Sequence, residues 1–202
     1  MQRIFHTPEG VRDIYSQECS RKQKLQEKLH RVFHQYGFED IETPTFEYFE
    51  VFSKEVGTIP SRELYKFFDR EGNTLVLRPD FTPSVSRACA TYFNPEKEVV
   101  SLCYTGNTFI NNSSFRGRLK ETTQMGVERM GDDSPEADAE ILAMTVECLL
   151  ATGLTEFQVS VGQVDYYKAI FAQTGMSQEE EEELRELISQ KNYFGVERAC
   201  KE

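Results

Sequence analysis

The stretch CYTGNTFINNSSFRGRLKETTQMGVE, residues 103–128, contains the pattern that decides the fold. Its ends belong to two segments, 99–106 and 120–131, whose bulky and β-branched residues favour extended strands. A long polar loop that is rich in Asn and Ser separates them. We therefore expect two antiparallel strands, joined by a loop whose length within a compact domain is typical of a functional or mobile segment.

Three segments around these strands carry helix signals. Residues 16–36 place apolar side chains at helical spacing, with Ser16 as the expected N-cap and Gly37 just after the last turn. Residues 81–93 begin near a Thr-Pro pair, which suits the first turn of a helix. Residues 134–152 begin with Ser and Pro and stop before a glycine, which is the clearest helix pattern in the chain.

Shorter extended segments complete the pattern. One of them contains Pro44, a residue that is tolerated best at a strand end or edge. The sequence REGN (70–73) predicts a hairpin turn between the segments 64–69 and 74–80. The segment EFQVSVG (156–162) alternates apolar and polar residues, as a half-buried strand does. Hairpins and long helices without a βαβ rhythm predict an α+β domain, an antiparallel sheet with helices on one side.

The composition limits the function classes. Of the 202 residues, 39% are hydrophobic, which is enough for a core. The net charge of −11 argues against a nonspecific nucleic-acid binder, because such proteins need Lys and Arg to displace counterions from phosphates. No apolar run approaches the roughly 18 residues of a membrane span, and the N-terminus shows no signal-peptide pattern. We expect a cytoplasmic protein with neither membrane nor nucleic acid as a partner.

The cysteines and histidines show no clear metal-binding pattern. The five cysteines are scattered without a CxxC motif, so we interpret them as small buried hydrophobic residues rather than as disulfides or zinc ligands. His30 and His34 stand four apart on the first predicted helix, a spacing that can chelate a metal. No third ligand is apparent, so we interpret them as surface histidines and expect no metal and no cofactor.

Several segments, taken in order, resemble one known family. Together they are similar to the catalytic core of class II aminoacyl-tRNA synthetases, and of histidyl-tRNA synthetase in particular, from about residue 5 to about residue 170. These segments are TPEGVRDI (7–14), the helix-to-strand unit that ends at Pro44, LRPDFTPSVSR (77–87), RGRLKETTQMGVE (116–128), and the capped helix 134–152 with the segment after it.

The resemblance also implies a domain organisation. We expect residues 1–175 to form a class II synthetase-like α+β core, an antiparallel sheet flanked by helices and incomplete at its C-terminal end. The family's third motif would lie beyond residue 202. Residues 176–202, which are acidic and predict a helix with a capping box from Ser177 to Glu180, would start an insertion or the remaining part of a longer protein.

The ATP-binding positions of the family are degenerate in this sequence. The resemblance places Thr105 and Asn107 where class II synthetases have an Arg-x-Glu pattern that grips the α-phosphate of ATP. A guanidinium can bind phosphate in a bidentate manner, and neither Thr nor Asn can do so. After Gly117 and Arg118, Thr122 stands where the family has a phenylalanine that stacks on adenine. Arg118, like Arg116, can equally be an ordinary loop charge.

The resemblance places the histidine pocket of the family at four residues of this sequence. These residues are Asp80, Thr82, Gln124 and Glu128. One carboxylate would hold the α-ammonium of the ligand, and another would accept an imidazole N–H. Alternatives remain open, since Asp80 can simply cap the helix that starts near Thr82, and Gln124 and Glu128 can form a solvated strand face.

The resemblance implies a function and partners. The leading hypothesis is the non-catalytic regulatory subunit of ATP phosphoribosyltransferase, which is required for activity of the short catalytic subunit and for feedback inhibition by L-histidine in histidine biosynthesis. We expect it to form a homodimer through the segment around Pro44, within a hetero-oligomer. The alternative is a histidyl-tRNA synthetase with a divergent second motif. A third hypothesis is an interaction module without a ligand.

Overall fold

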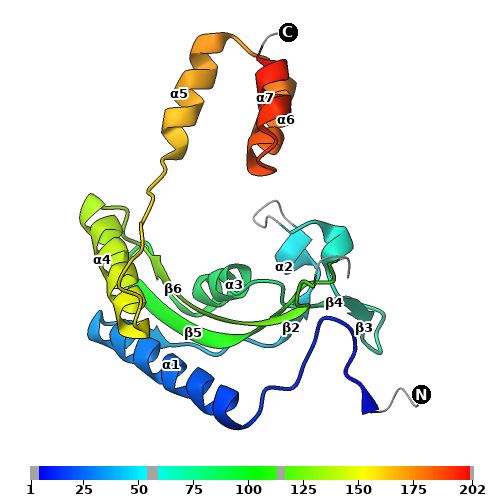
Figure 1. Ribbon diagram of the computed structural model, residues 1–202, viewed down its shortest axis with the longest axis vertical. Helices are drawn as coiled ribbons and strands as arrows, with labels where there is room; N and C mark the ends of the chain where they lie inside the picture. Colours follow the sequence, from blue (N-terminus) through cyan, green and yellow to red (C-terminus); the bar gives the residue numbers. More distant parts are fainter. Residues whose placement is uncertain (1–4, 54–58, 113–116, 201–202) are drawn as a thin grey trace. The chain divides into compact units, whose positions relative to one another are not determined.

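The fold is described by a computed structural model for residues 5–53, 59–112 and 117–200 (Figure 1). The chain divides into two compact units, Met1–Phe157 and Gln158–Glu202. The helix α5 (Val164–Thr174), which precedes the 175/176 boundary that the sequence suggested, belongs to the second unit. There Phe171 is buried, and the guanidinium of Arg185 lies 5.9 Å from the centre of its ring.

The two predicted central strands are confirmed. They are β5 (Val100–Phe109) and β6 (Glu121–Met130), which pair antiparallel along their whole length. The two-residue strand β1 (Glu39–Asp40) pairs parallel to β5, so that this three-stranded sheet has the order β1-β5-β6. Of the loop between β5 and β6, residues 113–116, which include Arg116, lie outside the described residues.

A second sheet of the first unit contains the predicted REGN hairpin. Its strands are β2 (Phe46–Tyr48), β3 (Lys66–Phe68) and β4 (Thr74–Leu77), and they are antiparallel in the order β2-β4-β3. In the turn between β3 and β4, the carboxylate of Asp69 accepts hydrogen bonds from the backbone N–H groups of Glu71 and Asn73. Gly72 has a φ of 87°, a conformation that costs a glycine little.

The helices predicted near residues 16–36, 81–93, 134–152 and after 177 are present, whereas the sequence analysis did not predict α5. The first unit contains α1 (Ser16–Gln35), α2 (Glu50–Ser53), the 3-10 turn η2 (Ser61–Glu63), α3 (Thr82–Tyr92) and α4 (Pro135–Thr152). The second unit contains α5, α6 (Gln178–Ser189) and α7 (Tyr193–Ala199). The predicted capping box between Ser177 and Glu180 is confirmed at the start of α6.

The helix ends test the capping predictions one by one. Ser134 caps α4, because its hydroxyl accepts the backbone N–H of Ala137, and Gly153 ends α4 with a φ of 98°. The prediction of Ser16 as the cap of α1 is wrong, since Ser16 is already the first helical residue and Tyr15 holds the cap position. Tyr15 makes no side-chain capping bond, and the buried residues of α1, Val32 and Phe33, lie toward its other end.

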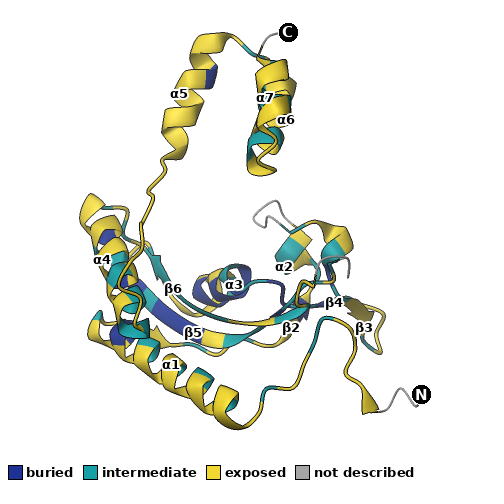
Figure 2. Cartoon of the chain, in the orientation of Figure 1, coloured by how far each residue is buried: buried dark blue, intermediate teal, exposed yellow. Residues whose placement is uncertain are grey.

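Apolar residues pack on both faces of the β5–β6 hairpin, so the expectation of helices on one side is wrong (Figures 1 and 2). On one face, which we call the α3 face, Val100, Leu102 and Tyr104 pack with residues of α3. On the other, the α1 face, Cys103 packs with residues of α1 and α4. Side chains of successive strand residues point to opposite faces of a sheet, and β5 carries apolar residues on both of its faces. The α+β class itself is confirmed.

The predicted strand at 156–162 is wrong. The segment is described and has no strand conformation. Phe157, Val159 and Val161 are all exposed. Alternation of apolar and polar residues produces a strand only where a neighbouring strand supplies hydrogen bonds and an apolar face, and the described residues pair no strand with this segment. Among the same residues, no helix has the length and apolar character needed to cross a membrane.

Candidate functional site

Four residues that the sequence analysis singled out come together on the α3 face. The amide of Gln124 donates to Asp80 Oδ1 at 3.0 Å, and the hydroxyl of Thr82 donates to Glu128 Oε1 at 2.6 Å. Asp80 and Thr82 lie at the start of α3, and Gln124 and Glu128 lie on β6, four residues apart on one face. We call these four residues the carboxylate site.

The structure decides between the alternative roles of these residues in part. Asp80 Oδ1 accepts the backbone N–H of Phe81 at 2.7 Å and the amide of Gln124 at 3.0 Å. Phe81 holds the cap position of α3, which has no side-chain capping bond, so Asp80 is not the cap of this helix. Gln124 and Glu128 are half-buried, which excludes a fully solvated strand face. The site therefore holds two carboxylates in a partly desolvated environment, each with a neutral hydrogen-bond donor.

Two aromatic residues that the sequence analysis did not assign complete the site. Tyr104 on β5 stacks on Phe81 with ring centroids 4.3 Å apart, and its hydroxyl lies 3.5 Å from Glu128 Oε1. Tyr104 is paired across the hairpin with Gly126, where a Cβ atom would approach Tyr104 Cζ to 2.6 Å. The glycine therefore lets the phenol ring lie across β6. The pairing of a tyrosine with a glycine could have identified Tyr104 as a site residue, but it can be recognised only once the register of the two strands is known.

The environment of the carboxylate site raises the pKa values of Glu128 and Tyr104. Burial raises the pKa of Glu128, the hydrogen bond from Thr82 lowers it, and the nearby charge of Asp80 raises it, with a net upward shift. Burial also raises the pKa of Tyr104, and the charges of Glu128 and Asp80 add to that shift. An ionised Glu128 is thus costly in the site without a ligand, and a cation placed beside it would relieve that cost.

The raised pKa of Glu128 predicts a pH-dependent contribution to folding. The folded protein holds this proton more tightly than the unfolded chain, so the contribution is complete below the ordinary pKa of 4.5 and is lost as pH rises through the folded value. We expect the free energy of unfolding of the unsubstituted protein, minus that of Glu128→Gln, to fall as pH rises through this window. Urea unfolding of both proteins across pH 4 to 8 measures this difference, and a difference that rises with pH would contradict it.

The four degenerate ATP-site positions are only partly brought together, because Asn107 and Thr122 line one cavity with Glu121 and Thr123. Thr122 lies on the α3 face, where its hydroxyl is 3.0 Å from that of Thr108. Thr105 and Asn107 have the opposite strand parity and lie on the α1 face, where Asn107 hydrogen-bonds Glu121 and Thr123. Arg118 is exposed in the loop before β6.

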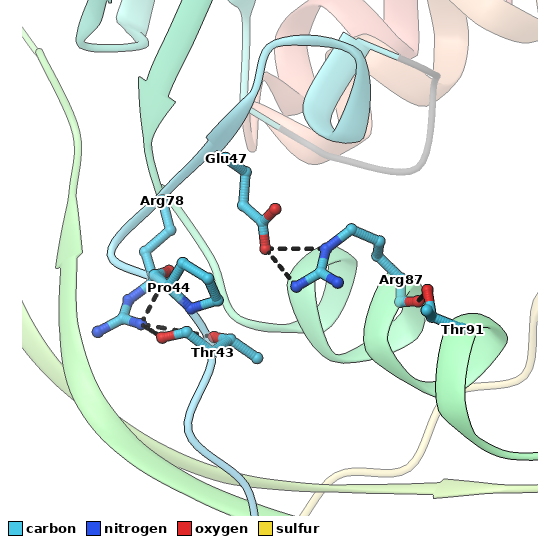
Figure 3. A network of polar contacts seen from close by, with 6 residues as sticks. All are labelled: Thr43, Pro44, Glu47, Arg78, Arg87 and Thr91. Carbon is cyan, nitrogen blue, oxygen red and sulfur yellow. Dashed lines mark hydrogen bonds and ion pairs between the residues drawn. The ribbon is translucent and has the colours of Figure 1, made fainter.

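A buried arginine fixes the strand and helix that position the site (Figure 3). Arg78, which is 8% exposed, donates to the carbonyl oxygen atoms of Asn107, Thr43 and Pro44 at 2.9, 2.8 and 3.3 Å. Its guanidinium lies 4.0 Å from the centre of the Phe81 ring. Arg78 thereby ties the segment before β2 and the strand β5 to the start of α3.

An ion pair near Arg78 links β2 to α3. Glu47 is buried, and its Oε1 accepts from Nε and Nη2 of Arg87 at 3.0 and 2.8 Å (Figure 3). The carbonyl oxygen of Arg87 in turn accepts from the hydroxyl of Thr91. The pair is charge-assisted and half-buried, so it fixes α3 against the second sheet more firmly than an exposed ion pair would.

Comparison with known proteins places this geometry in a family. The model of the histidyl-tRNA synthetase family matches residues 10–202. The chain is 42% identical over 198 residues, 98% of its length, to an ATP phosphoribosyltransferase regulatory subunit of Acetivibrio thermocellus, and it covers 47% of that protein. It is also 42% identical over 96% of its length to a subunit of the same name from Ruminiclostridium cellulolyticum, of which it covers 46%.

A solved structure has the same fold. The chain superposes with a TM-score of 0.87 and 32% identity on the crystal structure of an ATP phosphoribosyltransferase regulatory subunit/histidyl-tRNA synthetase from Bacillus halodurans, covering 98% of this chain and 51% of that one. The chain thus spans about half the length of the relatives it matches. It belongs to the histidyl-tRNA synthetase family, and within that family it resembles the ATP phosphoribosyltransferase regulatory subunits.

Proposed function

We propose that this protein is a regulatory subunit of ATP phosphoribosyltransferase that binds L-histidine in the carboxylate site. Two sequence relatives at 42% identity carry the name of that subunit. The observation that carries the ligand assignment is the convergence of Asp80, Thr82, Gln124 and Glu128 in two hydrogen-bonded pairs. Both carboxylates are half-buried, and they are close enough for the charge of Asp80 to raise the pKa of Glu128. Histidine offers both a cationic ammonium group and a neutral N–H donor.

The chemistry of the site fits such a ligand. An α-ammonium group beside Asp80 or Glu128 would replace weak neutral donors by a charge-assisted hydrogen bond, which is roughly twice as strong. The imidazole N–H needs an acceptor, and Glu128 lies at the partly buried end beside Tyr104. The flat stacked pair of Tyr104 and Phe81 gives the site a rigid apolar wall.

The residue types on the α3 face support the assignment of a non-catalytic role. Class II activation needs a cation at the α-phosphate of ATP. The positions of β5 and β6 that face the carboxylate site are Tyr104, Gly106, Thr108, Thr122, Gln124, Gly126 and Glu128. None of these is an arginine or lysine. The nearby Arg78 is engaged with backbone carbonyl groups and the Phe81 ring.

Assembly is part of the proposal. In the described first unit β2 is an edge strand of its sheet, and its Phe46 and Tyr48 are 50% and 55% exposed. An edge strand with exposed aromatic residues, just after Pro44, suits pairing with a second copy of the protein. We propose a homodimer through this edge, within a hetero-oligomer that contains the short catalytic subunit.

A calorimetric titration tests the ligand assignment. We expect L-histidine to bind the full-length protein with one site per chain, and L-alanine and imidazole alone to bind much more weakly, because each offers only one of the two groups. Absence of heat with histidine would contradict the assignment and favour an interaction module without a ligand. Histidine-dependent exchange of pyrophosphate into ATP would instead support the alternative, a histidyl-tRNA synthetase.

A further inference from the structure

Four potential metal ligands lie together on the α1 face, away from the carboxylate site. They are His30 and His34 of α1, Asp40 of β1 and Cys103 of β5, and their donor atoms all lie within 4.8 Å of one another. His30 Nε2 is 2.5 Å from Asp40 Oδ1, and His34 Nε2 is 3.0 Å from Asp40 Oδ2. The thiol of Cys103 lies 3.5 Å from Asp40 Oδ1.

The backbone holds these residues together. After α1, Gly37 has a φ of 79°, and the N–H groups of Gly37 and Phe38 bond the carbonyl groups of His34 and Phe33. This is a Schellman ending, which turns the chain back beneath the helix. The next residues form β1, where Asp40 is the direct register partner of Cys103 in the parallel pair with β5.

The histidine rings already converge. Their centroids are 4.1 Å apart, as the i, i+4 spacing on one helix face allows. Their side chains are 38% and 46% exposed, so an ion can reach them from solvent, whereas Cys103 is fully buried beneath. The sequence analysis found no third ligand because Asp40 and Cys103 become neighbours of the histidines only in the fold.

We propose that His30, His34, Asp40 and Cys103 form a binding site for a divalent transition metal, with Zn²⁺ as the best fit. Two imidazoles, a carboxylate and a thiolate are typical ligands of four-coordinate zinc. Ligand lengths of about 2.0–2.3 Å place donor atoms of a tetrahedral site roughly 3.3–3.7 Å apart. The present distances around Asp40 require changes of about 1 Å or less, which side-chain rotation supplies.

Without a metal, the same four residues could serve only as a hydrogen-bonded cluster that links α1 to β1. Asp40 then accepts hydrogen bonds from both imidazoles, and the contact with His30 lowers the pKa of Asp40. Metal binding at the Cys103 thiol requires the loss of its proton, because the thiolate is the metal ligand. That requirement makes the thiol the most informative ligand, since hydrogen bonding between histidine and aspartate requires no change at Cys103.

A bound ion would fix the core from the side opposite the carboxylate site. It would join the last two turns of α1 to β1 and β5, and Cys103 directly precedes Tyr104 in β5. With four protein ligands the site would be closed, as in structural rather than catalytic zinc sites. Because only the folded protein assembles the four ligands, metal binding would stabilise the fold.

Cobalt provides the direct test, because a Co²⁺–thiolate bond gives a charge-transfer absorption band. We expect the full-length, chelator-treated protein to bind one equivalent of Co²⁺ with this band, and excess Zn²⁺ to abolish it. We expect His30→Ala and His34→Ala each to weaken Zn²⁺ binding by more than about tenfold, in competition with a chromophoric chelator, since even outer-shell changes cost that much. Cys103→Ser should remove the thiolate band.

Matched variants separate the site from adventitious binding. His6→Ala and Cys19→Ser change the same residue types outside the cluster, and both should leave affinity and spectrum unchanged. His30 and His34 lie on the exposed part of α1, so their variants remain informative even if Cys103→Ser fails to fold. Absence of the band in the unsubstituted protein, or equal losses for His30→Ala and His6→Ala, would overturn the proposal.

Discussion

Glu128→Gln is expected to weaken L-histidine binding by roughly 10- to 100-fold. The substitution keeps the shape of the side chain and the hydrogen-bonding partner Thr82, but it removes the charge that a cationic ligand would contact. Hydrogen bonds to charged groups contribute about 1.5–3 kcal/mol, and each 1.4 kcal/mol is a tenfold change in Kd. Calorimetric titration of histidine into both full-length proteins measures the effect.

The same substitution at Glu121 is the matched control. Glu121 lies on β6 as Glu128 does and is also half-buried, but it lies on the α1 face, where it accepts a hydrogen bond from Asn107. Glu121→Gln should therefore leave the histidine affinity within about twofold of the unsubstituted value, a change of about 0.4 kcal/mol. Equal losses for the two variants, or no loss for Glu128→Gln, would remove Glu128 from the proposed pocket.

Arg78→Met is expected to lower the free energy of unfolding by about 2–4 kcal/mol. The change keeps much of the side-chain volume but leaves the carbonyl groups of Asn107 and Thr43 without their buried donor. Each buried polar group left unsatisfied costs about 1–3 kcal/mol. The free energy of unfolding of Arg78→Lys should lie between those of the unsubstituted protein and Arg78→Met, because an ammonium group cannot reproduce the forked geometry of the guanidinium. Urea unfolding followed by circular dichroism measures both.

Arg70→Met provides the control for this prediction. Arg70 is exposed in the turn between β3 and β4, and the same change there should alter the free energy of unfolding by about 0.5 kcal/mol or less. If Arg78→Met were equally harmless, the contacts of Arg78 with the Pro44 segment would contribute little to the fold. The positioning of α3 beside the carboxylate site would then need another explanation.

Local patterns were enough to predict α1, α3, α4 and α6 and the main hairpins, but they did not predict α5. Ser134 and Gly153 bracket α4 because capping depends on residues next to the helix end. Where a tertiary partner decides, local pattern failed, since residues 156–162 alternate like a strand but have no neighbouring strand among the described residues. The cap predicted at Ser16 is also absent, because α1 starts at that residue without a side-chain capping bond. The sequence also suggested helices on one side, since it does not show which face each apolar residue of β5 occupies.

Only the family resemblance and the alternation of side chains along a strand allowed residues of the carboxylate site to be predicted from the sequence. Gln124 and Glu128 share one face whatever the rest of the fold, because they are four apart on a strand. The parity of Thr105 and Asn107 relative to that face depends on the hairpin register, which a long loop leaves open. The same limit concealed the pairing of Asp40 with Cys103, which are 63 positions apart in the chain.

Reconstitution tests the central claim most directly. The full-length protein, mixed with a short-form ATP phosphoribosyltransferase catalytic subunit, would be assayed for product formation with and without L-histidine. We expect activity to require both proteins and to fall as histidine rises, with Glu128→Gln shifting inhibition to higher histidine concentration, because regulation requires that histidine bind the inhibited state more tightly than the active one. A transferase whose activity is independent of this protein at every histidine concentration would contradict the regulatory assignment.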